Sequence, residues 1–380
     1  MQLSDPTFSR DVDVAIIGGG VVGLACGAEL ACAGQRVLVL ERGGRVGAET
    51  SSRNSQVIHA GIYYLEGTHK ALCCVEGRDL LYERCERLGI PHRRVGKLIV
   101  ATAPEEIPTL ERMQARAVAN GAGGIEWCDA AEIARREPRV RAVAGLWSPN
   151  TGIVDAHALV ESYRAEMESA GGVVALRTEV VGLARTTDGW RVETIGPDGA
   201  TFTLDVPLLV NAAGLGSDRV AEMAGIDLDE QAWRLHFCKG SYFGAAPGLG
   251  PLTTHLVYPV PTDGGLGAHV TIDLDGRYRF GPDAEPVDEI SYRVDPSKRD
   301  RFAEAVQRYL PEIRPEDLHP EMAGIRPKRV GPGGPFADFV IEETSHLGAP
   351  GMVQLIGIES PGLTSAGAIA RRVSELLGHS

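Results

Sequence analysis

The N-terminal segment of the chain, residues 12–41, reads VDVAIIGGGVVGLACGAELACAGQRVLVLE. Two short apolar runs, 14–17 and 37–40, flank three glycines and an apolar stretch, 21–33, that has the length of a helix. Short apolar runs bounded by glycine are typical of buried strands, and a longer apolar stretch is typical of a helix. The segment therefore predicts a strand–helix–strand unit at the start of the chain.

The glycines of this unit follow the spacing Gly18-x-Gly20-x-x-Gly23, between the first strand and the helix. In a dinucleotide-binding unit the first glycine permits the tight turn, the second lets the backbone approach a pyrophosphate, and the third lets helix and strand pack closely. The helix N-terminus supplies free N–H groups for the phosphates. Glu41 ends the second strand, where a carboxylate can hold ribose hydroxyls. Spacing and context together predict a dinucleotide site.

A further apolar strand, 207–210, is followed by Asn211-Ala212-Ala213-Gly214-Leu215-Gly216, and such a return strand is typical of FAD-binding sheets. The sequence has no second GxGxxG motif, since Arg219 stands where a last glycine would be, and it has no C-x-x-C dithiol. A reductase that uses NAD(P)H would need a second nucleotide-binding domain. We therefore expect electrons to enter the flavin directly from an organic substrate. The last cysteine is Cys238, so non-covalent FAD is expected.

The composition excludes several classes of protein. A formal net charge of -13 in 380 residues argues against a nucleic-acid partner. No apolar run approaches the roughly 18–20 residues that span a bilayer, and residues 1–10 lack the pattern of an export signal. The seven cysteines are interpreted as small buried residues in a reducing compartment, which predicts a cytoplasmic protein. Neither metal-ligand spacing nor a G-x-S-x-G motif occurs, so no metal site and no hydrolase are expected.

The two ends of the chain resemble each other, and different material lies between them. An apolar strand, 352–358, and a helix, 363–377, repeat the style of the opening unit. This predicts a two-lobed α/β (α+β) fold, in which a Rossmann-like FAD-binding domain is discontinuous and a substrate-binding domain with a mixed sheet interrupts it twice. The expected FAD-binding domain comprises 1–88, 145–230 and 330–380, and the expected substrate-binding domain comprises 89–144 and 231–329.

Two longer motifs, SSRNSQVIHAGIYY at 51–64 and GIESPGLTS at 357–365, resemble the flavin-contacting segment and the C-terminal flavin loop of FAD-dependent L-2-hydroxyglutarate dehydrogenases. That family belongs to the D-amino-acid-oxidase-like group of flavoproteins. Four shorter motifs also fit its pattern: KGSYF at 239–243, VYPVP at 257–261, LGAH at 266–269 and AGIRP at 323–327. Arg53 and Gln56 stand where the family tends to have His and Gly, and Gly367 stands where it tends to have a larger residue.

The resemblance implies which residues carry the chemistry. Removing a hydroxyl proton calls for a general base, and His59 is the expected one, with His269 as a second candidate. A planar guanidinium suits a carboxylate, and Arg326 stands where the wider group keeps its carboxylate-binding arginine. Lys239 is assigned to a second carboxylate and Tyr258 to the pocket wall. For each of these residues a purely structural role is the alternative.

The start of the last helix, 362–365, is expected to place backbone N–H groups near flavin N1 and O2, where negative charge develops on reduction. Together the nucleotide motif and the resemblance predict the residues that bind the cofactor. These are Gly18, Gly20, Gly23, Glu41, Arg42, Ser51, Ser52, Asn54, Ser55, Val180, Ala213, Gly214, Gly357, Pro361, Gly362, Leu363, Thr364 and Ser365.

The reaction implied by the resemblance is hydride transfer from a small-molecule (S)-2-hydroxy acid to flavin N5, with a histidine taking the hydroxyl proton. L-2-hydroxyglutarate, which gives 2-oxoglutarate, is the expected substrate. One alternative is an amine or amino-acid oxidase of the same fold, acting on glycine, sarcosine or a related compound. Another is a flavin-binding protein without turnover. The electron acceptor stays open among oxygen, a quinone and another flavoprotein, as does a peripheral contact with the inner membrane.

Overall fold

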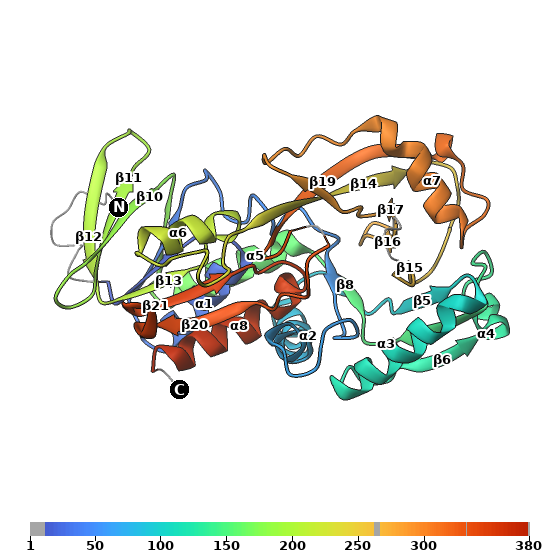
Figure 1. The fold of residues 1–380 in the computed structure, drawn as a ribbon, viewed down its shortest axis with the longest axis horizontal. Coiled ribbons are helices and arrows are strands. Elements are labelled where there is room, and N and C mark those ends of the chain that lie inside the picture. Colours follow the sequence, from blue (N-terminus) through green and yellow to red (C-terminus); the bar gives the residue numbers. More distant parts are fainter. Residues whose placement is uncertain (1–11, 262–266, 332, 379–380) are drawn as a thin grey trace.

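The computed structural model describes residues 12–261, 267–331 and 333–378. Figure 1 shows an elongated molecule in two halves. One half is built on a six-stranded sheet and the other on a nine-stranded sheet. A small sheet lies between them and consists of β3 (Val57–Ile58), β8 (Gly152–Val154) and β4 (His92–Arg93).

The six-stranded sheet has the opening strand near its centre. β1 (Val14–Ile17) pairs in parallel with β2 (Val37–Glu41) on one side and with β13 (Leu208–Asn211) on the other. Three more strands complete the order β20-β21-β13-β1-β2-β9: β9 (Val173–Leu176), β21 (Ala349–Ile356) and the antiparallel β20 (Val340–Thr344). Strands from both ends of the chain therefore form one sheet, which confirms the predicted Rossmann-like α/β fold.

In the described part of the chain, four helices cover one face of this sheet, and a second small sheet and one short helix cover the other (Figure 1). The helices share one apolar core with the strands, and they are α1 (Val21–Cys32), α2 (His69–Leu88), α5 (Ala156–Ser169) and α8 (Gly362–Leu376). Asp155 caps α5 by accepting hydrogen bonds from the N–H groups of His157 and Ala158 at 2.9 and 3.0 Å. The opposite face packs on β10 (Glu179–Arg185), β11 (Trp190–Ile195), β12 (Thr201–Val206) and α6 (Ser217–Met223).

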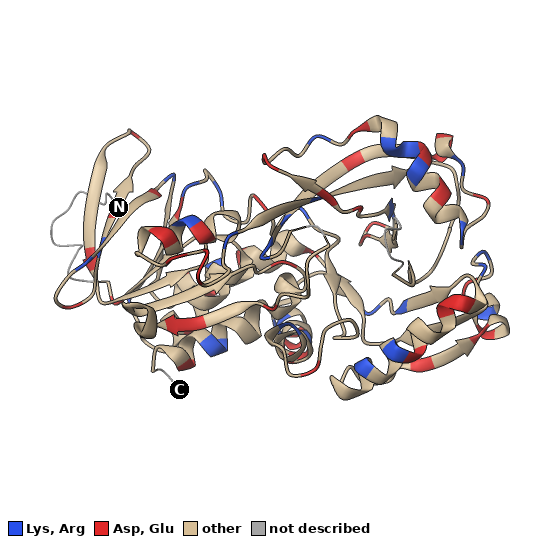
Figure 2. Cartoon of the chain, in the orientation of Figure 1, with Lys and Arg blue, Asp and Glu red and all other residues tan. Residues whose placement is uncertain are grey.

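The nine-stranded sheet is built around the long antiparallel pair β14 (His236–Ala245) and β19 (Leu318–Lys328), which reaches from one half of the molecule into the other (Figure 1). Its remaining strands are β5 (Lys97–Ala101), β6 (Glu126–Asp129), β7 (Ala144–Ser148), β15 (Leu256–Pro259), β16 (Val270–Ile272), β17 (Tyr278–Phe280) and β18 (Glu285–Val287). The helices of this half are α3 (Ile107–Ala119), α4 (Ala130–Arg136) and α7 (Arg299–Gln307), and Figure 2 shows many charged residues on them. None of the helices in the described ranges has the length and hydropathy that crossing a bilayer requires.

Strand β7 does not follow the expected division of the chain. It pairs with β5 and β6 in the nine-stranded sheet, whereas the predicted boundary at residue 145 gives it to the FAD-binding domain. A short apolar strand reads the same in either sheet, so the sequence does not reveal its partner. We propose the same two-domain division with this boundary moved to residues 149–151.

Candidate active site

The turn between β1 and α1 has little room for side chains. Gly18 has a φ of +110°, and a Cβ on it would lie 2.4 Å from the carbonyl oxygen of Ala212. A Cβ on Gly23 would lie 2.0 Å from the carbonyl oxygen of Gly18. Among the described residues, a Cβ on Gly20 would meet only Ser51 Oγ, at 3.2 Å. The first and third glycines therefore shape the turn, and the second keeps its backbone accessible.

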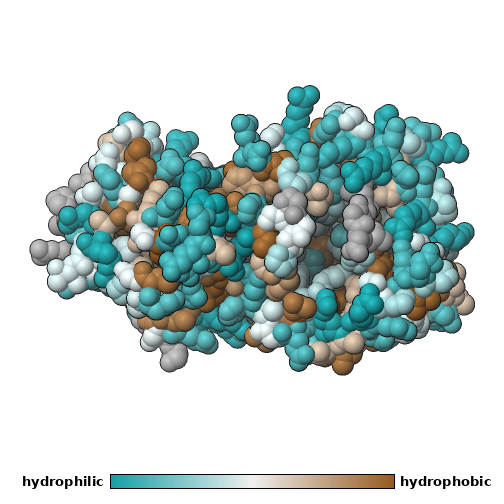
Figure 3. Space-filling model, in the orientation of Figure 1, coloured by the Kyte–Doolittle hydropathy of each residue, from teal (hydrophilic) through white to brown (hydrophobic). Residues whose placement is uncertain are grey.

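Two adjoining cavities meet at this turn. The turn cavity, of about 160 Å³, includes Gly18, Glu41, Arg42, Val180 and Ala213 in its lining. The central cavity, of about 330 Å³, includes His59, Tyr242, Tyr258, His269 and Arg326 in its lining. The two share Gly20, Thr50, Ser51, Ala212 and Gly214. On the face that Figure 3 shows, the surface is mostly hydrophilic, with scattered apolar residues and a hollow between the two halves of the molecule.

Glu41 fixes the loop that borders the turn cavity. Its Oε2 accepts a hydrogen bond from the Gly19 N–H at 2.8 Å, and its Oε1 accepts one from the Gly43 N–H at 2.5 Å. A carboxylate has further acceptor positions beyond these two. The residue therefore holds the turn and still presents acceptors to ribose hydroxyls in the cavity.

The two cavities together fit an extended dinucleotide. The first residues of α1 (Val21 and Val22) and of α8 (Gly362 and Leu363) both border the central cavity. The N-termini of helices favour negative charge, as in a pyrophosphate or a reduced flavin. Gly20, which has no side chain of its own, borders both cavities. The residues present therefore fit FAD.

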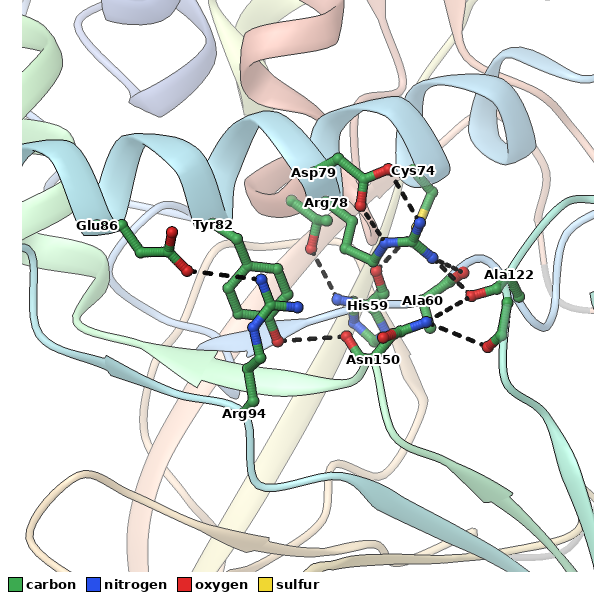
Figure 4. A network of polar contacts seen from close by, with 12 residues as sticks. His59, Ala60, Cys74, Arg78, Asp79, Tyr82, Glu86, Arg94, Ala122 and Asn150 are labelled. Carbon is green, nitrogen blue, oxygen red and sulfur yellow. Dashed lines mark hydrogen bonds and ion pairs between the residues drawn. The ribbon is translucent and has the colours of Figure 1, made fainter.

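Helices α2 and α8 hold the backbone of His59. Its N–H donates a hydrogen bond to Thr364 Oγ1 at 3.0 Å, and its carbonyl oxygen accepts one from the Cys74 thiol at 3.6 Å. Figure 4 shows how α2 supports this loop: Arg78, one turn beyond Cys74, donates to the carbonyl oxygen of Ala60 at 3.4 Å. The position of His59 therefore depends on elements that are distant in sequence.

The imidazole rings of His59 and His269 both border the central cavity. His59 Nε2 lies 3.3 Å from Ser360 Oγ, and its Nδ1 is buried with no hydrogen-bond partner among the described residues. The His269 ring stacks on Tyr258, with 3.6 Å between the ring centroids and 3° between the planes. Burial and, after it, the charge of Lys97 lower the pKa of each histidine to about 3. Both imidazoles are therefore neutral at neutral pH, and each has a nitrogen that accepts a proton.

The guanidinium of Arg326 borders the central cavity from β19. Its Nη1 and Nη2 donate hydrogen bonds to the carbonyl oxygen of Asp283 at 3.2 and 3.1 Å. Among the residues that the structure describes, no carboxylate forms an ion pair with it within 4.0 Å. A Cβ on Gly240 would lie 2.8 Å from Nη2, so the glycine of the KGSYF motif leaves room for the guanidinium. A partly buried cation without a counter-ion suits the carboxylate of a ligand.

Lys239 does not line the central cavity, contrary to the role expected from the sequence. Its neighbours Gly240 and Tyr242 line the cavity, and successive side chains of a strand point to opposite faces. The Lys239 amine instead donates a hydrogen bond to the carbonyl oxygen of Arg293. Residues on both faces of this part of β14 are buried, so the sequence does not reveal which face borders the cavity.

Several residues of the site were missed in the sequence analysis, among them Arg53, Gln56 and Lys97. Arg53 borders the central cavity, its Cζ lies 4.0 Å from the ring centroid of Tyr292, and its Nε is buried with no hydrogen-bond partner among the described residues. Gln56, also at the cavity, has a φ of +59°. Lys97 is fully buried against Tyr258. Arg53 and Gln56 gave a signal, because both depart from the family pattern, whereas Lys97 gave none.

The predicted cofactor-binding residues fall into two groups. Those that border a cavity are Gly18, Gly20, Glu41, Arg42, Ser51, Asn54, Ser55, Val180, Ala213, Gly214, Pro361, Gly362 and Leu363. Those that border neither cavity are Gly23, Ser52, Gly357, Thr364 and Ser365. Some of the second group shape the site from behind: Gly23 packs on the turn, and Thr364 receives the His59 N–H.

Known proteins resemble the chain along nearly its whole length. A family model described as "DAO: FAD dependent oxidoreductase" matches residues 13–376. The mitochondrial L-2-hydroxyglutarate dehydrogenase of Arabidopsis thaliana is 38% identical over 96% of this chain and 83% of that protein. The L-2-hydroxyglutarate dehydrogenase of Escherichia coli is 28% identical over 93% of this chain and 90% of that protein.

Solved structures share the architecture. L-α-glycerophosphate oxidase of Mycoplasma pneumoniae with FAD bound has a TM-score of 0.86 and 27% identity, over 97% of this chain and 95% of that chain. Glycine oxidase of Geobacillus kaustophilus has a TM-score of 0.78 and 24% identity, over 96% and 94%. The glycine oxidase likeness shows the fold alone.

Proposed function

Because the chain belongs to the family of FAD-dependent oxidoreductases, we propose that it oxidises an (S)-2-hydroxy acid to the 2-oxo acid, with L-2-hydroxyglutarate as substrate and 2-oxoglutarate as product. Relatives named for this activity match nearly the whole chain. The observation that carries the proposal is the position of the Arg326 guanidinium. It has no carboxylate partner among the described residues and shares a cavity with two neutral histidines.

FAD, when bound, supplies the acceptor for the hydride that leaves C2 of the substrate. The residues that would hold it are the turn at Gly18 and Gly20, the carboxylate of Glu41, and the N-termini of α1 and α8. The start of α8 would stabilise the negative charge that accompanies reduction. The protein contributes position and electrostatics, and the cofactor contributes the redox chemistry.

The substrate is held through its carboxylates. A guanidinium forms two parallel hydrogen bonds with a carboxylate, so Arg326 is assigned to C1, which orients C2 and its hydroxyl. Arg53 is the second guanidinium at the cavity and takes the role expected of Lys239, the distal carboxylate. A pocket with two guanidinium groups suits a dicarboxylate, because a monocarboxylate leaves one of these cations without an anion.

A histidine takes the proton of the hydroxyl. His59 is the first candidate, since its Nδ1 has no partner among the described residues, and His269 is the second. Their lowered pKa keeps both rings unprotonated before substrate binds. A substrate carboxylate favours the protonated imidazole and raises its pKa, so the ring becomes a better base when the substrate arrives.

The proposal is tested by mixing the purified protein with candidate substrates without oxygen and following the absorbance of oxidised flavin. L-2-hydroxyglutarate should bleach the flavin, and the D enantiomer, L-lactate, glycine, sarcosine and glycerol 3-phosphate should do so much more slowly or not at all. Faster bleaching by glycine or sarcosine would identify an amine oxidase. No bleaching by any compound would identify a flavin-binding protein without turnover. Reoxidation with oxygen and with a soluble quinone, in separate samples, identifies the class of electron acceptor.

A further inference from the structure

Lys97 is a lysine that the proposed reaction does not use, and it lies next to the wall of the central cavity. It begins β5, has an exposed fraction of 0%, and is one of only five lysines in the chain. Its Nζ lies 4.5 Å from the ring centroid of Tyr63 and 4.8 Å from that of Tyr258. Tyr258 borders the cavity and stacks on His269. The buried amine and His269 therefore lie against the same ring.

Packing does not account for this amine. Among the described residues, Lys97 Nζ has no hydrogen-bond partner, and it forms no ion pair. Burying an ammonium group without a counter-ion destabilises a fold, and two tyrosine rings compensate only in part. A methionine would fill similar space without a polar group to desolvate. Lys97 therefore makes the fold less stable than an apolar residue would, which indicates that it has a functional role.

The groups that face Lys97 come from every element packed around it. They are His59 and Tyr63 from the loop after β3, Tyr258 from β15, His269 from the segment before β16, and Cys74 from α2. Arg326 adds its charge to that of Lys97 at His269. On β7, Ser148 lies opposite Lys97, and its hydroxyl pairs with Thr151 Oγ1 at 3.0 Å. This set contains no carboxylate.

The ionisation of Lys97 falls in an informative pH range. Burial lowers its pKa to about 7, and the neighbouring Cys74 opposes that shift. Lys97 therefore gains its positive charge as the pH falls through about 7. Burial already lowers the pKa of His59 and His269 to about 3, so these rings take up protons only at pH values where Lys97 carries its charge. Like charges repel each other, so a charged Lys97 opposes protonation of the two histidines.

Resting on the proposed function, in which a histidine accepts the hydroxyl proton, we propose that Lys97 is a positioning residue that keeps His59 and His269 neutral as the surroundings become acidic. The charge of Lys97 acts on the two imidazoles through space, past the rings of Tyr63 and Tyr258, and Lys97 does not touch substrate or cofactor. The histidine that serves as the base thereby stays unprotonated at a lower pH than burial alone would allow.

The test is a histidine titration by NMR in the FAD-loaded protein, with 13C-labelled histidine and with His59→Gln and His269→Gln for assignment. In Lys97→Met the midpoints of both histidines should rise by about one pH unit, because a neighbouring charge shifts a pKa by about 1–3 units. Lys97→Arg keeps the charge and should raise neither midpoint. Lys239→Met removes a lysine that does not line the cavity, and as the matched control it should also raise neither.

A second readout is kcat/KM for L-2-hydroxyglutarate as a function of pH. Protonation of the base ends activity on the acid side, so the acid limb of Lys97→Met should move to higher pH by about the same unit. The limb of Lys97→Arg should stay in place. If the protein did not oxidise hydroxy acids at all, the NMR titration would still decide the role of Lys97, because it needs no substrate.

Two results would overturn the proposal. One is a folded Lys97→Met protein whose histidine midpoints equal those of the unaltered protein, above all if its thermal midpoint also falls, since that identifies a structural residue. If Lys97→Met does not fold, the same titration is run on Lys97→Gln, which is polar but uncharged. The second overturning result is that the histidine midpoints of this variant equal those of the unaltered protein.

Discussion

The turn between β1 and α1 and the wall of the central cavity are built on different principles. The turn consists of backbone, and two of its glycines matter because a side chain has no room there: a Cβ would lie 2.4 Å from a carbonyl oxygen at Gly18 and 2.0 Å from one at Gly23. The cavity wall consists of side chains from separate segments, among them His59, His269 and Arg326. One polar atom there, His59 Nδ1, has no hydrogen-bond partner in the part of the chain that the structure describes. A site made of backbone is set by local spacing, whereas a site made of side chains is set by topology.

The largest effect is expected within the turn, where two glycines should fail in different ways. Gly23→Val forces a side chain against the carbonyl of Gly18 and should destabilise the fold by about 3 kcal/mol or more. Gly20→Val meets only Ser51 Oγ and should leave the protein folded while it fills the space of the pyrophosphate, so that most FAD is lost. Thermal unfolding and flavin absorbance per protein measure the two effects. Equal losses of fold in both variants would contradict this distinction.

The next effect is expected at the cavity wall, where a single side chain should govern rate without affecting fold. Arg326→Ala removes a charge-assisted contact and should lower kcat/KM for L-2-hydroxyglutarate by about 10²–10³-fold. Arg326→Lys should recover only part of the loss, because an ammonium lacks the planar fork. FAD content and thermal midpoint should change little. Unaltered kinetics in Arg326→Ala would contradict the assignment of Arg326 to the C1 carboxylate.

A smaller effect should distinguish the two residues assigned to the distal carboxylate, which are Lys239 from the sequence and Arg53 from the structure. Arg53→Met should raise KM for L-2-hydroxyglutarate by about 10-fold, with a much smaller change for 2-hydroxy monocarboxylates. The Lys239 amine donates a hydrogen bond to the Arg293 carbonyl oxygen outside the cavity. Lys239→Met should therefore leave the preference for the dicarboxylate unchanged. Steady-state kinetics with both substrate classes decide between them. A loss of preference in Lys239→Met alone would restore the original assignment.

The smallest effect concerns backbone strain beside the cavity. Gln56 has a φ of +59°, a conformation that glycine adopts more readily. Gln56→Gly should therefore raise the free energy of unfolding by about 0.5–1 kcal/mol. Ala232→Gly, with a φ of +51°, is the matched control away from both cavities and should gain a similar amount. Denaturant unfolding measures both. A loss of stability in Gln56→Gly alone would show that the glutamine side chain supports the loop.

The sequence predicts the turn well because each step there is local. The GxGxxG spacing and the apolar strands act over a few residues, and the structure has them where they were expected. The shared sheet of the two chain ends followed from repeated strand and helix patterns. His59, His269 and Arg326, which were selected from the family motifs, all line the central cavity.

The remaining features depend on pairings that no local pattern specifies. The face of β14 on which Lys239 lies, and the sheet to which β7 belongs, follow from strand pairing across the fold. Lys97 is a charged residue at the start of an apolar strand, and only the fold brings it against Tyr258. Sequence reasoning therefore reached the backbone site and missed the electrostatic surroundings of the pocket.

The central claim is that the flavin takes a hydride from C2 of L-2-hydroxyglutarate. The direct test is an anaerobic single turnover with substrate that carries deuterium at C2, compared with unlabelled substrate. We predict that the flavin bleaches with both, that the labelled compound reacts several-fold more slowly, and that each flavin reduced yields one 2-oxoglutarate. Bleaching without 2-oxoglutarate, or no bleaching by either compound while glycine or glycerol 3-phosphate reduces the flavin, would contradict the claim.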